Sequence, residues 1–217
     1  FMAEIREMVR VAQRSVEFDR SDISKIAVVV DGPTIHQAAP QGAVWQALMT
    51  DQIPILGRVG APVSFYLLED LDRVPDRHTL YLFLYAAEST EAIRRALEEK
   101  VKRPGNVAVW LYAPGILRNG EFDAAAASEL TGIRLAVADE ESPFDVAVTE
   151  PAHALTAGTY GCSYGLQACS GIRTQGALWM GQVDPNKQPR QDAFRPATCR
   201  PTVYADDPDA EVLGYIA

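Results

Sequence analysis

The stretch KIAVVVD, residues 25–31, decides the fold class that this sequence predicts. It contains five consecutive apolar residues, three of which are Val. β-branched side chains favour strands, and a strand that is apolar on both sides is typical of a parallel sheet with both faces covered. Asp31 and the Gly-Pro pair that follows it have the composition of a loop. We therefore predict a buried parallel strand that ends at an acidic loop.

Working outward from this strand, the chain alternates between strand-like and helix-like segments. Further strands are predicted at residues 63–67, 80–85 and 107–111, the last within NVAVWLYAPGILRNG (residues 106–120). Helices are predicted at residues 2–19, 41–59, 89–101 and 121–132. The order β-α-β-β-α-β-α over residues 25–132 predicts a doubly wound α/β sheet that is mostly parallel. In such sheets, ligands bind at the carboxyl ends of the strands.

Local signals mark several helix ends. Ser89 or Thr90 is a suitable N-cap for the helix at 89–101, and Gly132 occupies a C-cap position. Pro54 kinks or restarts the helix at 41–59. The helix at 2–19 carries apolar residues at helical spacing, which fits either a packed helix or a linker helix that contacts a neighbour.

The pattern of predicted secondary structure changes after residue 133. Short strand-like runs occupy residues 133–140, 144–150, 176–184, 200–207 and 211–217, with turn residues between them. No long helical period occurs there. We expect an N-terminal linker helix at 1–24, an α/β core at 25–135, and a β-rich C-terminal extension of the same domain at 136–217.

Charge and composition exclude some classes of function. The chain has 217 residues, a net charge of −9 and a pI of about 4.8, so a nucleic-acid partner is not expected. No apolar run reaches the roughly 18 residues of a membrane span. The composition is that of a soluble protein and leaves its compartment open, cytoplasmic or exported.

One motif of a catalytic type is present. GCSYG, residues 161–165, fits G-x-S-x-G, the nucleophile elbow of α/β-hydrolases, which requires a preceding strand and a downstream His. The three histidines, His36, His78 and His153, all precede Ser163. A serine without a general base is a weak nucleophile. A Gly-rich turn is therefore the favoured interpretation.

The three cysteines do not form a recognisable site. Cys162, Cys169 and Cys199 include no C-x-x-C pair, and no nearby residue type is suited to activate a thiolate. We expect structural thiols, and one disulfide stays open as an alternative if the protein is exported. Zinc spacing, G-x-G-x-x-G and G-x-x-x-x-G-K-[ST] are absent, so we predict no metal and no cofactor.

Four residues are candidates for a ligand-binding site. Asp31, Glu88, Tyr112 and Asn119 all lie at or just past predicted strand ends, and we expect them to converge on one rim of the sheet. The alternative is structural: Asp31 caps a local turn and Tyr112 packs.

The four predicted strands and their loops also resemble a known family. The segments ISKIAVVVDGPT, LGRVGAPVSFYLLEDL, LYLFLYAAESTEAIRRALEEKV and NVAVWLYAPGIL…SELTGI together resemble the class I glutamine-amidotransferase-like domain found inside glycoside hydrolases. The β-galactosidase trimerisation domain is the relative most similar in kind. The resemblance covers residues 2–135 well and the rest loosely. It implies a flavodoxin-like fold that follows a catalytic (β/α)8 barrel.

The sequence departs from this family where its chemistry takes place. An active glutamine amidotransferase carries G-x-C-x-G after the fourth strand, whereas residues 111–115 are Leu-Tyr-Ala-Pro-Gly. The partner motif His-x-Glu is also missing, because Ala154 and Leu155 follow His153. Acyl transfer at this position is therefore not expected.

The resemblance leads to three hypotheses. The first is a non-catalytic assembly or scaffold domain of a larger glycoside-hydrolase-like protein. Its expected partners are further copies of the chain, a preceding catalytic barrel, or both. Residues 2–19, the helix containing Trp45 and the β-rich tail are the candidate contact surfaces. The second is a hydrolase or amidotransferase with an unrecognised site. The third is a carbohydrate- or small-ligand-binding module in which Trp110, Tyr112 or Trp179 stacks on a sugar.

Overall fold

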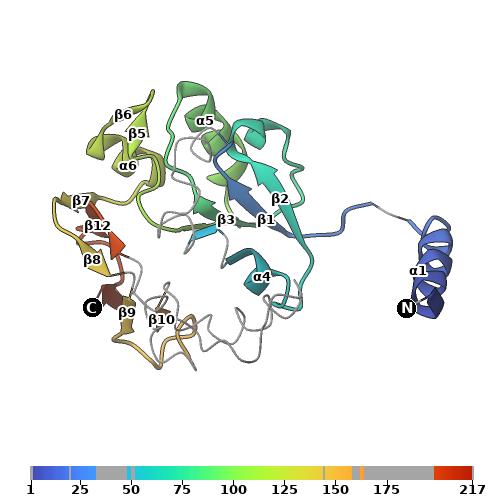
Figure 1. Cartoon of the computed structure of the whole chain (residues 1–217). Helices are drawn as coiled ribbons and strands as arrows, with labels where there is room; N and C mark the ends of the chain where they lie inside the picture. Colours follow the sequence, from blue (N-terminus) through green and yellow to red (C-terminus); the bar gives the residue numbers. More distant parts are fainter. Residues whose placement is uncertain are drawn as a thin grey trace.

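The computed structural model describes residues 2–19, 21–32, 48–49, 52–143, 145–157, 162–163 and 198–216 (Figure 1). The α/β part contains α1 (Met2–Ser15), β1 (Ile26–Val30), α4 (Gln52–Leu56), β2 (Val63–Leu67), the 3-10 helix η2 (Leu68–Arg73), β3 (Leu80–Tyr85), α5 (Glu91–Ala96), the π-helix η3 (Leu97–Val101), β4 (Val107–Trp110), β5 (Leu117–Arg118), β6 (Glu121–Phe122) and α6 (Ala124–Thr131). The remainder contains β7 (Leu135–Ala138), β8 (Ser142–Pro143), β9 (Asp145–Val148), β10 (Cys162–Ser163), β11 (Thr198–Cys199), β12 (Thr202–Ala205) and β13 (Gly214–Ile216).

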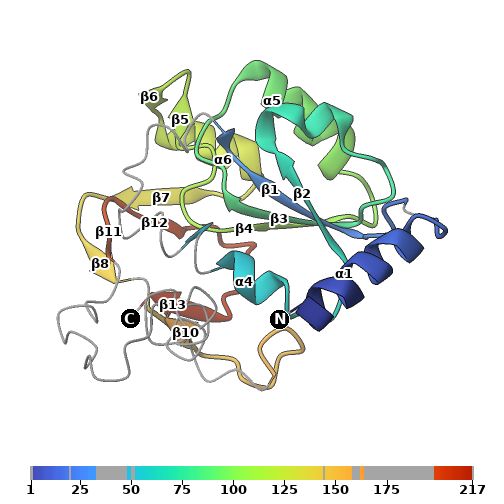
Figure 2. The same cartoon turned by 45° about the vertical axis from the view of Figure 1, so that its right-hand side comes forward.

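A four-stranded parallel sheet forms the centre of the molecule. Its strand order is β2-β1-β3-β4, and every pair in it is parallel. Residues 27–30 of β1 are buried on both sides of the sheet, as the apolar run at 25–31 predicts. Helices lie on both faces, with α5 on one side and α4 on the other (Figure 2). The predicted flavodoxin-like α/β architecture is confirmed.

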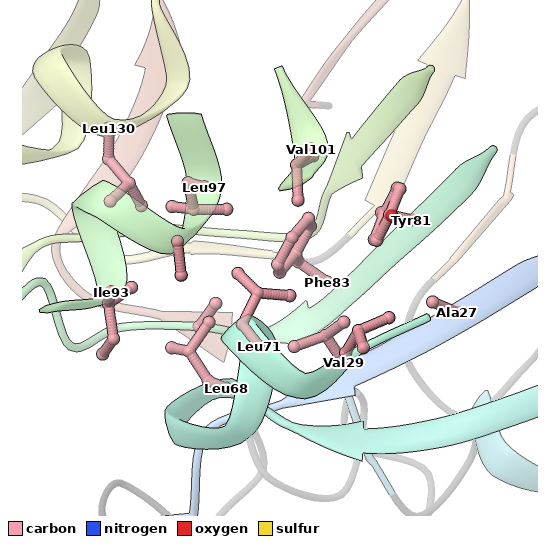
Figure 3. Close-up of a cluster of buried hydrophobic side chains, with 13 residues drawn as sticks. Ala27, Val29, Leu68, Leu71, Tyr81, Phe83, Ile93, Leu97, Val101 and Leu130 are labelled. Carbon is pink, nitrogen blue, oxygen red and sulfur yellow. The ribbon is translucent and has the colours of Figure 1, made fainter. Parts of the chain in front are cut away.

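The larger core lies on the face covered by η2, α5, η3 and α6. Phe83 lies at the middle of it, and Trp110 stacks on the Phe83 ring with centroids 3.9 Å apart. Figure 3 shows Leu71 of η2 near Phe83, and Leu130 of α6 farther away, on the other side of Leu97. The opposite face carries Val28, Val30 and Leu84, against which Met49 and Leu56 pack. Trp110 is therefore a half-buried residue whose ring stacks on Phe83 at the edge of this core.

Most of the helix signals act as expected. Thr90 caps α5 by accepting a hydrogen bond from the Ile93 N–H (3.3 Å), and Gly132 ends α6 with φ +75°. Past α5 the helix widens into η3, where the N–H of Lys102 donates to the Leu97 carbonyl five residues earlier (2.9 Å).

Two predicted helices are shorter than expected. The helix at 2–19 ends at Ser15, whose hydroxyl donates to the Ala12 carbonyl (2.7 Å) and so competes with the helical ladder. The helix at 41–59 ends at Leu56 and continues through Pro54; Gly57 begins a turn there. Its expected first half, with Trp45, lies outside the described residues.

The β-rich part consists of short antiparallel pairs. β12 pairs with β7 over four residues, β9 pairs with β10 and β13, and β8 pairs with β11. Leu135, Val137 and Val203 of β7 and β12 pack against a buried group next to the sheet that includes Ala113 and Ile116. The strand-like run at 176–184 lies outside the described residues.

Helix α1 stands apart from the rest of the molecule, joined to β1 by an extended segment (Figure 1). None of its residues is buried. Within the described residues, no helix has the length and apolar character needed to cross a lipid bilayer.

Candidate functional site

Three acidic residues follow three neighbouring strands at the carboxyl edge of the sheet. Asp31 follows β1, Glu69 lies in the turn after β2, and Glu88 lies three residues past β3. Because these strands are adjacent and parallel, their carboxyl ends meet at one rim. Asp31 and Glu88 are the two predicted site residues that the sheet itself places there.

Asp31 is buried and bonded to the backbone of the neighbouring strand's loop. Its side chain is 1% exposed, and Oδ2 accepts a hydrogen bond from the Glu88 N–H at 2.8 Å. Its own N–H donates to the Tyr85 carbonyl at 2.9 Å. Burial and then the Asp31 carboxylate raise the pKa of Tyr85 above its ordinary value. Asp31 thus joins the ends of β1 and β3.

Glu88 fixes the hairpin formed by β5 and β6. Its side chain is 8% exposed, and Oε1 accepts from the Asn119 N–H (2.9 Å) and from the Ser89 N–H (3.2 Å). Asn119 lies at the tip of that hairpin with φ +53°. The predicted convergence therefore holds for Asp31, Glu88 and Asn119. Asn119 joins the rim through its backbone.

Glu69 also acts on the backbone at this rim. Its Oε2 accepts from the Gly32 N–H at 3.2 Å. A Cβ at Gly32 would lie 2.1 Å from the Glu69 Oε1, so the carboxylate approaches where only glycine leaves space. The position of Glu69 just past β2 is the sequence signal that identifies it as a rim residue.

The loop after β4 has a strained backbone. Tyr112 and Ala113 have φ +37° and +38°, a conformation that costs L-residues about 1–2 kcal/mol each. Gly115 follows with φ +66°, and its N–H donates to the Ala86 carbonyl at 2.7 Å. This sharp bend lies where the resembling enzymes place their nucleophile, and the chain has Tyr and Ala there.

Tyr112 links its loop to a distant part of the chain. Its hydroxyl donates to the carbonyl of Pro201 at 2.7 Å, between positions 89 residues apart. The bond ties the strained bend to the strand pair formed by β7 and β12. The structural alternative for Tyr112, packing of its ring, agrees with its place beside the buried group around Ala113.

A cavity of about 480 Å³ opens beside Glu88, between η2 and α5. Its polar lining includes Glu69, Asp72, Arg73, Glu88, Thr90 and Arg95. Apolar side chains of Leu68 and Ile93 form part of its wall. Sequence reasoning identified Glu88 but not the residues of η2 and α5, because their approach depends on how the two helices pack.

Two of the three histidines lie in the described part of the chain, and their contacts are away from the strained bend. His78 is at the opposite, amino edge of the sheet, just before β3, and the Nε2 of His153 lies 3.8 Å from a Glu211 carboxylate oxygen. His36 lies outside the described residues.

The structure describes two residues of the GCSYG motif, Cys162 and Ser163. Cys162 and Ser163 form the short strand β10, which pairs antiparallel with β9. A nucleophile elbow needs a turn between a strand and a helix, and the residues that follow Ser163 lie outside the described part of the chain, so neither the elbow nor the favoured Gly-rich turn is tested there. Cys169 and Trp179 lie outside the described residues, and Cys199 lies in β11. In the described part of the chain, no group of three His, Cys, Asp or Glu residues is arranged to hold a metal ion.

Comparison with known proteins does not identify a family or an activity for this chain. No protein-family model and no curated protein matches the chain. Among solved structures, it matches a ThuA-like protein from Bacteroides uniformis with 13% identity and a TM-score of 0.47. The match covers 92% of this chain and 70% of that one. A likeness this weak bears on neither family nor activity, and the resemblance to a trimerisation domain is not confirmed by it.

Proposed function

We propose that this chain is a non-catalytic assembly domain of a larger glycoside-hydrolase-like protein, and that it associates with further copies of itself through α1. The observation that carries the proposal is the exposed apolar face of α1. Met8 is 71% exposed, Val9 49% and Ile5 37%. All three lie on one side of the helix, at a spacing of three and four residues.

A helix of this kind is stable only when its apolar face is covered. An isolated helix of about 14 residues is marginal in water, because its nucleation is costly. Each apolar side chain that becomes fully buried contributes about 1.5–3 kcal/mol. Burial of this face against a second copy would supply the stabilisation that α1 lacks within its own chain.

The bend after β4 supports the same proposal. It keeps the strained backbone of a nucleophile-bearing turn, but Tyr112 directs its hydroxyl to the Pro201 carbonyl. A phenol in that bond is not positioned by a base for attack on a carbonyl group. A bend without a nucleophile at this position supports a structural role over acyl transfer.

Light scattering coupled to size-exclusion chromatography tests the assembly function. We expect the chain to elute as a multiple of its 23.7 kDa mass, and Met8→Glu to shift it to the monomer. Ala3→Glu is the matched control, since it adds the same charge on the opposite side of α1. A wild-type chain that is monomeric at 100 μM, or an equal effect of both variants, would refute the proposal.

A second candidate, a small-ligand- or carbohydrate-binding module, is favoured by the cavity beside Glu88. Its mixture of carboxylates, guanidinium groups and apolar wall suits a polar ligand with several hydroxyl groups. Calorimetric titration with a panel of mono- and disaccharides tests it. Saturable binding that Arg95→Ala weakens ten-fold, and that Arg58→Ala leaves unchanged, supports this candidate. Absence of binding across the panel rejects it.

A further inference from the structure

The segment that joins α1 to β1, residues 21–25, is fastened to the amino edge of the sheet. The Lys25 carbonyl accepts from the N–H groups of Thr79 (3.0 Å) and Leu80 (3.2 Å). Ser24 is 1% exposed, and its N–H donates to Asp22 Oδ1 at 2.8 Å. We call residues 21–25 the lead-in segment. It is the part of the connection between α1 and β1 that contacts the sheet, and residues 16–20 lie between it and α1.

Asp22 is the centre of the polar contacts that hold the lead-in segment. Its Oδ2 accepts from the Ser64 hydroxyl (2.7 Å) and the Tyr66 hydroxyl (3.3 Å), both on β2, and it forms an ion pair with Arg77. The hydrogen bond from Ser64, together with those from Ser24 and Arg77, holds the pKa of the Asp22 carboxyl well below its usual range. Asp22 therefore links the lead-in segment to β2 and to the loop before β3.

His78 completes this group from the interior. It is fully buried, and its Nε2 lies 2.9 Å from the Tyr66 hydroxyl. Its Nδ1 is buried and has no hydrogen-bond partner among the described residues. The tautomer that leaves no donor unmet has Nε2–H donating to Tyr66, while the Tyr66 hydroxyl donates to Asp22. Nδ1 then carries no proton, and its free lone pair is the site that would bind a proton when the ring becomes charged.

The surroundings of His78 disfavour the protonated form of its ring. The charged or titratable groups around the ring are Asp22 and Lys25 of the lead-in segment, Tyr66 of β2, Arg77 beside it, and Tyr81 of β3. Burial first, and then Arg77, lower the pKa of His78 below its ordinary value of 6.5; Lys25 acts in the same direction and Asp22 against it. A protonated ring would place an N–H donor where no acceptor waits for it.

We propose that Asp22, Ser64, Tyr66, Arg77 and His78 form an acid-sensitive clamp that opens when His78 binds a proton, releases the lead-in segment and frees α1 to change its position relative to the sheet. The direction of the pH dependence follows from the linkage between proton binding and the stability of the closed clamp. A histidine with a lowered pKa in the closed state stabilises that state above pH 6.5, and this contribution is lost as the pH falls below 6.5. Asp22, whose pKa is lowered, adds a further loss of stability only as the pH falls below its ordinary value of 3.8. The clamp does not depend on the assembly function.

Amide hydrogen exchange followed by mass spectrometry tests the clamp on the full chain at low concentration. After correction for intrinsic exchange rates, we expect protection of residues 21–25 and of the Thr79 and Leu80 amides to fall about ten-fold between pH 7.5 and pH 5.5. Ten-fold is the expected ratio of the open-state populations at pH 5.5 and pH 7.5, if His78 has a pKa of 6.5 in the open state and binds no proton in the closed state. Protection of the central residues of β1 should not change by the same factor.

Two variants separate the clamp from a general effect of acid. His78→Gln keeps a donor toward Tyr66 and cannot titrate, so the pH dependence at residues 21–25 should disappear. His153→Gln, a half-buried histidine elsewhere, should retain it. Equal pH dependence in wild type and His78→Gln would overturn the proposal. If His78→Gln does not fold, an NMR titration of the wild-type ring decides: a His78 pKa at or above 6.5 in the folded chain also overturns it.

Discussion

At the carboxyl edge of the sheet, Asp31 and Glu88 accept hydrogen bonds from main-chain N–H groups of other loops. Asp31 accepts from the N–H of Glu88, three residues past β3, and Glu88 accepts from the tip of the β5–β6 hairpin. Each carboxylate therefore substitutes for a missing backbone acceptor at a strand end. Two of the four candidate ligand residues thus have a structural role, and Glu88 combines it with a position in the cavity wall.

We predict that Glu88→Ala lowers the free energy of unfolding by about 1–3 kcal/mol. The substitution removes two hydrogen bonds to a buried carboxylate: the Asn119 N–H loses its acceptor, and the Ser89 N–H keeps only its 2.7 Å bond to the Leu117 carbonyl. Urea denaturation measures the change. Glu99→Ala, which removes an exposed carboxylate from the same cavity wall, is the control and should change stability by less than about 0.5 kcal/mol. Equal effects of the two variants would contradict the structural role of Glu88.

Gly115 offers a second test at this scale. A Cβ there would lie 2.7 Å from the Leu130 Cδ2, and φ is +66°. Gly120 has a similar φ of +79° with no atom within 4 Å of a built Cβ. We expect Gly120→Ala to cost about 1 kcal/mol from the backbone alone, and Gly115→Ala to cost at least about 1 kcal/mol more from overpacking. Thermal or urea unfolding of both proteins checks the difference, and equal costs would show that Leu130 moves away freely.

Among the elements, α6 shows how a short helix is stabilised at both ends. Asp123 accepts from the N–H groups of Ala125 (3.0 Å) and Ala126 (3.2 Å), and Gly132 closes the helix in the left-handed conformation. Between them, Ala126, Ala127 and Leu130 are buried. α6 in turn supports the strained bend, because Leu130 packs beside Gly115.

We predict that Asp123→Ala destabilises the protein by about 1 kcal/mol through loss of the N-cap. Asp123 also forms an ion pair with Arg118, at 2.8 Å. Asp123→Asn keeps the cap and removes the charge, so it should cost clearly less. Denaturant unfolding of the three proteins distinguishes the contributions; if Asn and Ala are equally destabilising, the ion pair and not the cap is what matters.

At the scale of the whole molecule, the sheet is well packed against its neighbouring elements, whereas α1 is exposed. The sheet is covered on both faces and continues into the β7–β12 pair through Leu135, Val137 and Val203. α1 contributes no buried residue, and among the described elements it stands apart from the sheet (Figure 1). Stability of the fold and association through α1 are therefore separable properties.

Deletion of residues 1–20 tests this separation. The clamp at Asp22 remains intact, so we expect the melting temperature of the truncated monomer to stay within about 2 °C of that of the Met8→Glu monomer, which corresponds to less than about 1 kcal/mol. Calorimetry provides the measurement, and light scattering should report a monomer. A much lower melting temperature would show that α1 belongs to the folding unit.

The sequence by itself determined the elements that depend on local pattern. Residues 63–67 and 80–85 form strands at the predicted bounds, and Thr90 and Gly132 act as caps. Hydrophobic periodicity, β-branching and capping chemistry act between residues that are near one another in the chain, so they can be read from it directly. The absence of a nucleophile at residues 111–115 is also a property of the sequence alone.

Only the tertiary structure decided which groups meet across the chain. The bond from Tyr112 to Pro201 and the grouping of Asp22, Tyr66 and His78 join residues from separate elements, and no local spacing encodes them. The exposure of α1 is equally non-local: an amphipathic pattern predicts an apolar face but not the surface that covers it. Such contacts depend on how strands pair and how helices pack. Strand pairing and helix packing are determined by the whole fold together and not by any single segment.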